Sequence, residues 1–397
     1  MRIAQIVPLH IPVPPLKYGG TERVVANLIA GLLELGHDVT LFATGDSETR
    51  ARLVPMWDRH IFFDPTIDAA AVHMGMLSEI YNDWANEFDV IHSHLDYMTL
   101  RFIDLTSVPT VLTLHGRLDS PEFRKVFAYH RNANYVSISD NQRRDMPDLN
   151  WVQTVYHGID VQSFPFVAER GEYLAFVGRM SHEKRPDLAI EVAIRAGIPL
   201  KIAAKVDHKE QPYFEERIEP LLKHRLITWM GEVDEEGKKD LLSHALALLM
   251  PIDWPEPFGM AFIEALACGT PVITRNCGSV PELLKDGVTG YVADTADELV
   301  EAVHKVKRIS RYTCRRYAEQ RFDKLRMAKD YMRVYDQVQP VRSPARGRTR
   351  ALYAFAARAA LADTAVLPVT ADTADSSLPV LAADVVAGEP MESAVVP

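Results

Sequence analysis

Short apolar segments alternate with helical segments along most of this chain, and this alternation limits the folds that it can adopt. In the first half, strand-like runs occupy 3–7, 38–43, 90–92, 110–114, 135–138 and 152–156, and an amphipathic helical pattern covers 22–35. Strands that alternate with helices are typical of βαβ units, in which helices cover a parallel sheet. The first half is therefore predicted to form a doubly wound α/β domain.

The same alternation starts again in the second half. Strand-like runs follow at 172–178, 200–206, 226–230, 245–249, 271–274 and 290–293, and a helix is predicted over 186–196. The segment Phe164-Pro165-Phe166 separates the two series and is the best candidate for a linker. We therefore predict two Rossmann-like domains, at 1–165 and 166–320, that face each other across a cleft suited to a small molecule.

Composition excludes several classes of protein. The net charge of −10 argues against a protein that binds nucleic acid, and no apolar run approaches the roughly 18 residues of a spanning helix. The N-terminus lacks the apolar region of a signal peptide, and the three cysteines suggest reduced thiols, so a cytoplasmic protein is expected. The segment 123–127 could touch a membrane peripherally, but a solvated helix face is favoured, so membrane contact is not indicated.

The composition changes near residue 340. Arginines at 342, 346, 348 and 350 are followed by a segment rich in Ala, Val, Thr and Pro that runs to Pro397. Few large apolar residues and no clear period are found there. We therefore predict a low-complexity, disordered tail over 341–397, without a binding role.

Two glutamates, Glu256 and Glu264, frame the start of a helix in the second half. The helix is predicted to begin near Phe258 or Gly259, where its first backbone N–H groups form a ready anion site. Glu264 lies one turn after Met260, on the same face of the helix. A ligand with a central phosphate and hydroxyls at both ends would satisfy all three features. Alternatively, Glu256 caps the helix N-terminus electrostatically and Glu264 pairs with a core arginine, and the helix alone does not separate these interpretations.

Other candidate site residues follow strand ends. Gly19-Gly20 opens a helix where the backbone can approach a phosphate, although an ordinary turn explains the pair as well. His115 ends a strand, where it can donate to a reacting oxygen, act as a general base or be structural. Arg179 and Lys184 share a strand-to-helix loop and can bind phosphate oxygens, with a solvated loop as the alternative.

A metal site is not predicted. His92 and His94 are expected at a strand end with their rings on opposite faces, a poor geometry for one ion, and a third ligand is missing. The chain also lacks an Asp-x-Asp motif. No metal or other cofactor is therefore expected.

Taken together, these residues resemble the retaining glycosyltransferases of family 4, which have the GT-B fold. The motifs that match are Gly19-Gly20, His115-Gly116, Gly178-Arg179, Glu183-Lys184, Glu256 to Glu264 followed by Ala265 to Ile273, Gly278 to Glu282 and Asp286 to Gly290. The chain departs from the family at 156–160, where His157 replaces the usual Asn before Gly-Ile-Asp. The resemblance covers roughly residues 1–340 and excludes the tail.

The resemblance implies a nucleotide-sugar donor, with UDP or GDP expected, that binds mainly to the second domain. By this resemblance, Arg179 and Lys184 hold the diphosphate, Glu264 accepts from the ribose, and Glu256 accepts from the transferred sugar. The remaining implied contacts are Gly19 and Gly20 near the phosphates, His115 at the donor sugar, Val233 at the base, and the backbone of Phe258, Gly259, Met260 and Ala261 over phosphate and sugar. A final helix within 321–340 would cross back onto the N-terminal domain.

The residues themselves agree with this interpretation. Breaking the bond to the diphosphate leaves negative charge there, and cations and a helix start stabilise such charge without a metal. No obvious carboxylate nucleophile is found in the first half, so same-face attack assisted by the leaving phosphate is favoured. The predicted function is retaining hexosyl transfer to an unknown glycan, lipid or small molecule, in polysaccharide or glycoconjugate biosynthesis. The alternatives are another GT-B enzyme, such as a phosphorylase or sugar-nucleotide epimerase, and a non-catalytic module that binds nucleotide sugars.

Overall fold

The fold is described from a computed structural model, which describes residues 1–17, 19–62 and 64–338. Two compact units are distinguished, and the first, Met1–Arg342, holds all of the described residues. The tail predicted over 341–397 lies outside the described residues.

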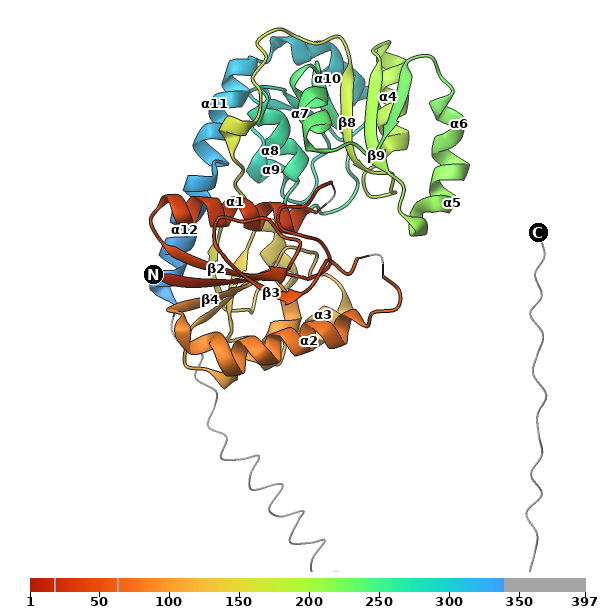
Figure 1. The fold of residues 1–397 in the computed structure, drawn as a ribbon. Coiled ribbons are helices and arrows are strands. Elements are labelled where there is room, and N and C mark those ends of the chain that lie inside the picture. The colour runs from red at the N-terminus through yellow and green to blue at the C-terminus, as the bar shows by residue number, and fades with distance from the viewer. Residues whose placement is uncertain (18, 63, 339–397) are drawn as a thin grey trace, which may run out of the picture. The chain divides into compact units, whose positions relative to one another are not determined.

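The first half forms a parallel sheet in which β1 lies between β2 and β4 (Figure 1). Among the described residues this sheet has seven strands, in the order β3-β2-β1-β4-β5-β6-β7. Their bounds are β1 (Arg2–Ile6), β2 (Asp38–Thr44), β3 (Arg52–Trp57), β4 (Val90–Ser93), β5 (Thr110–Thr113), β6 (Asn134–Ser137) and β7 (Trp151–Thr154). The sequence pattern predicts all of these except β3, a half-exposed edge strand that contains Pro55. Proline is tolerated at a sheet edge, but it weakens the strand signal in the sequence.

Helices cover this first sheet. The longer ones are α1 (Gly20–Glu34), α2 (Ala69–Glu79) and α3 (Pro121–Phe127). Shorter 3₁₀ and π segments lie at Ile80–Trp84, Ala85–Glu87, Asp96–Arg101, Ile103–Leu105, Asn141–Asp145 and Val161–Ser163. Helix α1 buries Val24, Leu28 and Leu32, which recur at helical spacing and form one apolar face.

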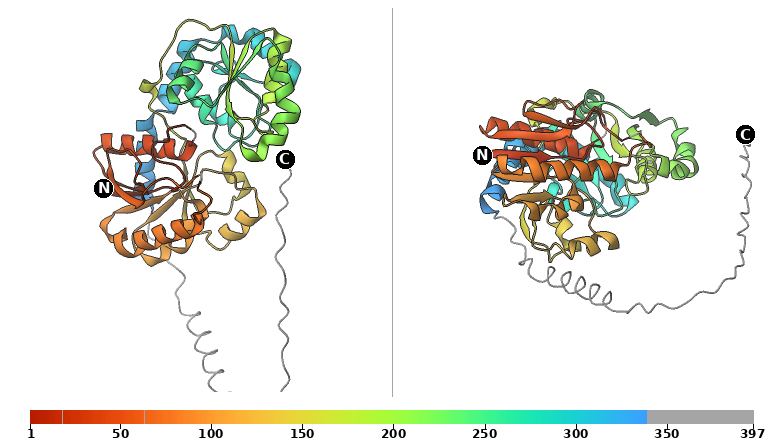
Figure 2. Two further views of the ribbon diagram at one scale, coloured as in Figure 1. Left: turned by 45° about the vertical axis from the view of Figure 1, so that its right-hand side comes forward. Right: turned by 60° about the horizontal axis from the view of Figure 1, so that its bottom comes forward.

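The second half forms another parallel sheet, with helices on both of its faces (Figure 2). In the described part of the chain it has six strands, in the order β10-β9-β8-β11-β12-β13. The strands are β8 (Leu174–Arg179), β9 (Leu200–Lys205), β10 (Ile227–Gly231), β11 (Ala247–Met250), β12 (Val272–Thr274) and β13 (Gly290–Val292). The helices are α4 (Pro186–Ala196), α5 (Gln211–Tyr213), α6 (Glu219–Leu222), α7 (Glu235–Ser243), α8 (Met260–Ala267), α9 (Val280–Leu283), α10 (Ala296–Lys305) and α11 (Arg311–Arg321). Short 3₁₀ and π segments lie at His208–Glu210, Phe214–Ile218 and Val306–Arg308.

The last described helix, α12 (Lys324–Gln337), returns to the first sheet. It lies beside α1, where a Cβ on Gly31 would come within 2.8 Å of the Ala328 Cβ, so glycine permits the close approach (Figure 1). Tyr331 and Tyr335 of α12 are buried in the core of the first half. Two doubly wound sheets and a helix that crosses back confirm the predicted architecture. We call the part built on β1 to β7 the first lobe and the part built on β8 to β13 the second lobe.

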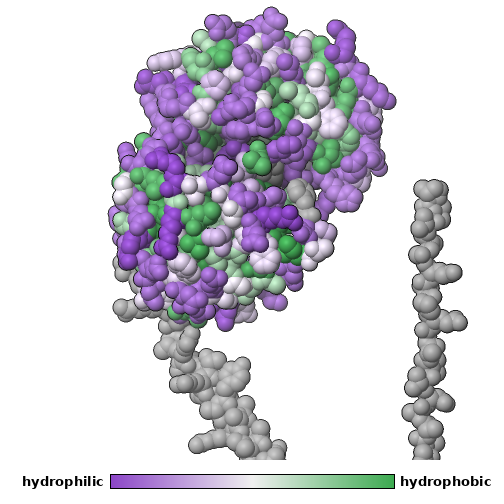
Figure 3. Space-filling model, in the orientation of Figure 1, coloured by the Kyte–Doolittle hydropathy of each residue, from purple (hydrophilic) through white to green (hydrophobic). Residues whose placement is uncertain are grey.

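The surface is mostly hydrophilic on the face drawn in Figure 3, with apolar residues in separate small areas. Among the residues that the structure describes, no helix has both the length and the apolar character needed to cross a membrane. In α3, Phe127 is buried against Tyr135, and Phe123 packs on Tyr97 with ring centroids 5.7 Å apart. The aromatic residues of this helix are thus used for packing within the first lobe.

Candidate active site

A large cavity lies where the carboxyl ends of strands from both lobes meet. Its volume is about 1260 Å³. Arg179 is the last residue of β8, His115 follows β5 by two residues, and Val233 follows β10 by two. The carboxyl ends of parallel strands are where ligands bind in such sheets. The cavity wall contains all of the predicted site residues: Gly19, Gly20, His115, Arg179, Lys184, Val233, Glu256, Phe258, Gly259, Met260, Ala261 and Glu264.

Helix α8 presents its N-terminus to this cavity. Gly259 precedes its first residue, and a side chain there would collide with the Phe262 ring, because a Cβ would lie 2.4 Å from it. Glu264, one turn into the helix, is 3% exposed and accepts from the Lys238 ammonium at 2.7 Å. The alternative in which Glu264 pairs with a core arginine is therefore wrong, since its partner is a lysine in the cavity wall.

Glu256 is held by two donors at the edge of the cavity. Its carboxylate is ion-paired with Lys184 and accepts from the Trp254 indole nitrogen at 2.9 Å. Both printed donors to this carboxylate lie outside α8, so Glu256 acts on the helix start through its charge if it acts on it at all, and the electrostatic capping alternative stays open. Gly278 has a φ of 57°, and a Cβ there would lie 2.3 Å from the Glu256 nitrogen. Glycine at 278 therefore lets the loop that carries Glu256 close onto the start of α9.

Arg179 lies among carboxylates that a phosphate could replace. Its guanidinium pairs with Glu183 at 3.1 Å and with Asp207 at 3.7 Å, and its side chain is 28% exposed. Arg117, from the first lobe, also pairs with Glu183, at 3.2 Å. Because these surface-accessible ion pairs are weak, an incoming dianion can exchange with the carboxylates at modest cost. The loop after β8 thus supplies positive charge to the cavity.

Gly19 and Gly20 lie at the N-terminus of α1, where no side chain covers the backbone. Gly19 has a φ of 151°, and a Cβ there would lie 2.6 Å from the Pro15 Cβ, so a larger residue does not fit. A Cβ on Gly20 would have no atom within 4 Å, because it would project into open space. Glycine is therefore required at position 19 because a side chain would collide with Pro15. At position 20 the lack of a side chain leaves space in the cavity beside the backbone.

His115 is neutral and tied to a second histidine. Its Nε2 lies 2.8 Å from Nδ1 of His94, and burial lowers the pKa of His115 to about 3. The His157 ring stacks on it, with centroids 5.3 Å apart, and packs against Phe258 of the cavity wall. The family's usual asparagine is thus replaced by a buried ring that supports His115. An uncharged imidazole can take part in hydrogen bonding but cannot act as an acid at neutral pH.

The expectation that the His92 and His94 rings point to opposite faces is wrong. Their ring centroids are 4.1 Å apart, because residues i and i+2 of a strand point to the same face. Both rings are buried, and His94 lies behind His115 and does not line the cavity. Within residues 1–17, 19–62 and 64–338, no three His, Cys, Asp or Glu side chains are grouped as a metal ion would need.

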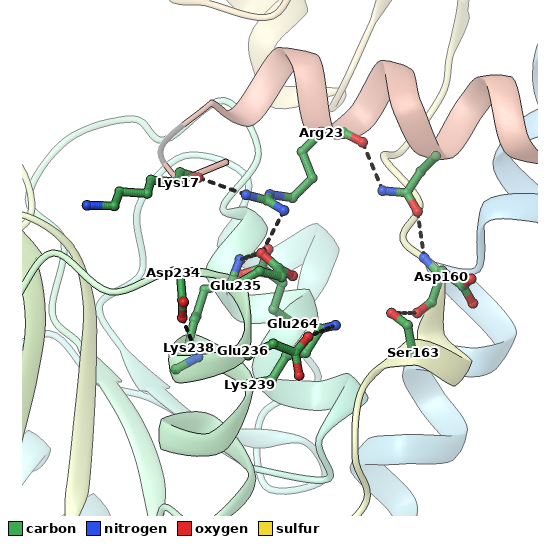
Figure 4. Close-up of polar contacts among 12 residues, drawn as sticks. Lys17, Arg23, Asp160, Ser163, Asp234, Glu235, Glu236, Lys238, Lys239 and Glu264 are labelled. Carbon is green, nitrogen blue, oxygen red and sulfur yellow. Dashed lines mark hydrogen bonds and ion pairs between the residues drawn. The ribbon is translucent and has the colours of Figure 1, made fainter. Parts of the chain in front are cut away.

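Charged residues that the sequence did not single out connect the lobes. Lys238 of α7 contacts Glu264 and also Glu235, the latter at 3.1 Å. Glu235 in turn pairs at 2.6 Å with Arg23 of α1, which reaches across from the first lobe (Figure 4). Arg23 also donates to the Lys17 carbonyl at 2.8 Å. No sequence pattern predicts this series of ion pairs, because its members resemble ordinary charged residues on the surfaces of helices.

The cavity wall also contains Glu22, which the sequence did not single out although it follows Gly20 by two residues. Glu22 is only 6% exposed, and in the described chain its side chain makes no ion pair and no hydrogen bond to another residue. Burial raises its pKa to about 7. The absence of an obvious carboxylate nucleophile in the first half stays a prediction, but the first lobe does place one carboxylate in the cavity wall, and burial stabilises it poorly as an anion.

Comparisons with known proteins agree with this geometry. The family model for glycosyl transferases group 1 matches residues 161–321, and the model for glycosyltransferase family 4 matches residues 18–163. Glycogen synthase of Mycobacterium tuberculosis is 27% identical over 333 residues, which cover 70% of this chain and 79% of that protein.

Solved structures show the same fold. Sucrose-phosphate synthase from Thermosynechococcus elongatus superposes with a TM-score of 0.70 at 18% identity, over 85% of this chain and 98% of that chain. Anabaena HepE, solved with UDP and glucose, gives a TM-score of 0.64 at 17% identity, over 85% and 99% of the two chains. The GT-B fold is thereby confirmed. The chain belongs to family 4 of the glycosyltransferases, and the prediction of a hexosyltransferase is confirmed.

Proposed function

We propose that this glycosyltransferase binds a nucleotide sugar in the cavity between its lobes and transfers the sugar with retention and without a metal ion. One observation carries the proposal. The start of α8 and the cations Arg179 and Lys184 line the same cavity as the two glutamates predicted to hold hydroxyl groups, Glu256 and Glu264. This arrangement suits a ligand with a diphosphate at its centre and a sugar at each end.

Each end of the donor then has a partner. The diphosphate lies between Arg179, Lys184 and the amides at the start of α8. Glu264 accepts from the ribose through its second oxygen, since Lys238 contacts only the first one among the described residues. Glu256, oriented by Trp254, accepts from the transferred sugar.

The chemistry follows from the charge that develops. The bond between the anomeric carbon and the phosphate oxygen breaks, and its electron pair stays on the diphosphate. The acceptor oxygen forms the new bond on the same face, and its proton passes to that phosphate oxygen. Fixed cations and helix amides aimed at the diphosphate stabilise the transition state more than the ground state, which is usually the largest catalytic contribution.

The cavity has room for a second substrate. Its volume of about 1260 Å³ exceeds the roughly 300–1,000 Å³ of most single-ligand pockets. The acceptor is placed against the first lobe, beyond Gly20 and His115. The HepE complex with UDP and glucose supports testing UDP-linked donors first, with GDP-linked donors next. A cytoplasmic location is the setting in which we expect such donors to be met.

Donor hydrolysis tests the proposal without knowledge of the acceptor. We expect one nucleotide among UDP-, GDP- and ADP-linked sugars to be released fastest, in buffer that contains a chelator. Arg179→Ala should lower this release about 10²- to 10³-fold. The matched control is Arg225→Ala, which removes an exposed arginine of the same lobe outside the cavity.

Three results would contradict the proposal. They are release from none of the donors, release that stops when the metal is chelated, and an Arg179→Ala rate equal to that of Arg225→Ala. Turnover that requires inorganic phosphate would instead favour a phosphorylase.

A further inference from the structure

His115 is the cavity end of a buried chain of hydrogen bonds. Its Nε2 lies 2.8 Å from His94 Nδ1, and His94 Nε2 lies 2.9 Å from the Gln5 side-chain oxygen. The Gln5 amide nitrogen donates to the Tyr335 hydroxyl at 3.2 Å. The chain thus runs from the cavity through His94, directly after β4, and Gln5 of β1 to α12, the helix that crosses back from the second lobe.

The members behind His115 are shielded from water. His94 is 2% exposed, Gln5 is 0% exposed and Tyr335 is 3% exposed. Burial lowers the pKa of His94 well below its ordinary value, so that ring is neutral, with one protonated nitrogen and one lone pair. A neutral ring in such a chain can donate in one direction only.

The orientation of Gln5 fixes that direction. Because its amide nitrogen is used by Tyr335, its oxygen faces His94 and can only accept. His94 must therefore carry its proton on Nε2, which leaves Nδ1 as an acceptor. His115 must then donate from Nε2 to His94, and its own Nδ1 keeps a lone pair. In the described residues, Nδ1 of His115 has no hydrogen-bond partner, and His115 lines the cavity.

We propose that Tyr335 and Gln5 are positioning residues that lock His115 in the tautomer with an unprotonated Nδ1, so that His115 accepts a hydrogen bond from a hydroxyl of the bound sugar. The inference rests on the proposed function only for the identity of the ligand. The family resemblance already implies that His115 reaches the donor sugar; the new part is the tautomer of His115 and the two residues that set it.

Two tyrosines of α12, Tyr335 and Tyr331, make further hydrogen bonds in this buried network. The Tyr335 hydroxyl also lies 2.8 Å from Nδ1 of His92, whose other nitrogen contacts Thr113 at 2.7 Å. Together with the Gln5 contact, these hydrogen bonds fix the position of the Tyr335 hydroxyl. Tyr331, one turn earlier on α12, contacts Thr113 at 2.9 Å and does not contact Gln5. The two tyrosines therefore offer a matched pair of variants.

The tautomer can be measured directly by nitrogen NMR on ¹⁵N-histidine-labelled protein, with His115 assigned by comparison with His115→Asn. In the wild type and in Tyr331→Phe we expect a pyridine-like shift at Nδ1 and a pyrrole-like shift at Nε2. In Tyr335→Phe the Gln5 amide is free to turn over, so both tautomers of His115 should appear. If Tyr335→Phe does not fold, Gln5→Met removes the same constraint and should give the same mixture.

The KM for donor hydrolysis provides a second test of the positioning role. Tyr335→Phe should raise KM for the hydrolysed donor about three- to tenfold, which corresponds to one weakened hydrogen bond, whereas Tyr331→Phe should stay within about twofold of the wild type. A protonated Nδ1 in the wild type, or an unchanged tautomer in both Tyr335→Phe and Gln5→Met, would overturn the proposal. The NMR result needs no turnover, so it stands or falls separately from the proposed function.

Discussion

Lys184 is expected to serve stability and catalysis at once, and the two roles can be separated. Lys184 and Glu256 form an ion pair in which the side chains are 13% and 12% exposed. Replacing lysine with methionine keeps most of the apolar stem but leaves Glu256 as a mostly buried charge in the cavity wall, with Trp254 as its donor among the described residues. Breaking a buried pair on one side costs about 3–5 kcal/mol, and we expect about 3 kcal/mol because Trp254 remains.

The matching double variant removes the penalty but not the catalytic defect. In Lys184→Met, Tm should fall by about 6–12 °C, at about 2–4 °C per kcal/mol for a domain of this size. Adding Glu256→Gln neutralises the stranded carboxylate, so most of the lost Tm should return. Donor hydrolysis should fall about 10²- to 10³-fold in both variants, because the diphosphate still lacks its cation.

Calorimetry and a nucleotide-release assay measure the two effects on the same samples. Lys223→Met is the control, since Lys223 is exposed on the second lobe and has no ion pair among the described residues. The reasoning is refuted if Lys184→Met retains turnover within about threefold of the wild type, or if the double variant regains wild-type turnover.

Three further outcomes test other parts of the site. Burial raises the Glu22 pKa from 4.5 to about 7, so its contribution to stability is present below pH 4.5 and is lost as pH rises through 7. Glu22→Gln should therefore gain up to about 3 kcal/mol over the wild type above pH 7, at about 1.4 kcal/mol per pKa unit, with no gain at pH 4 in denaturant titrations; equal differences at both pH values would contradict this. Gly20→Ala should fold as well as Gly75→Ala, since neither Cβ meets an atom within 4 Å, yet only Gly20→Ala should raise the donor KM, by about tenfold or more; equal KM values would remove Gly20 from the donor site. Arg23→Met should leave Glu235 without its partner across the lobes and raise the donor Kd by about threefold, a small effect typical of accessible pairs, and unchanged calorimetric binding would show that this bridge is irrelevant to the donor.

The sequence reveals the sheets because buried parallel strands are continuous apolar runs. Leu248 to Met250 is buried on both sides and is easily recognised. The edge strand β3 is half-exposed and contains Pro55, so its pattern is weak. The helix start at Gly259 is also readable, because glycine and proline mark the boundaries of α8.

The partners of charged residues could not be predicted in the same way. Lys184 and Glu256 are 72 residues apart, and their pairing depends on how β8 and β11 lie side by side in the sheet. Arg23 and Glu235 come from different lobes, so no local spacing connects them. Local pattern sets which residues reach the cavity, whereas tertiary packing decides which of them meet.

The roles of histidines depend on contacts that sequence does not contain. His115 was recognised from its place after a strand, but its tautomer depends on Gln5 and on Tyr335, which is 330 residues away from Gln5. The error over His92 and His94 was one of strand geometry, and the 4.1 Å between their rings corrects it.

A crystal structure with the nucleoside diphosphate that inhibits donor hydrolysis would test the central claim most directly. The account predicts that the diphosphate lies in the cavity within hydrogen-bonding distance of Arg179 and Lys184, with the ribose against Glu264. A nucleotide bound outside the cavity, or a diphosphate directed away from both cations, would contradict it.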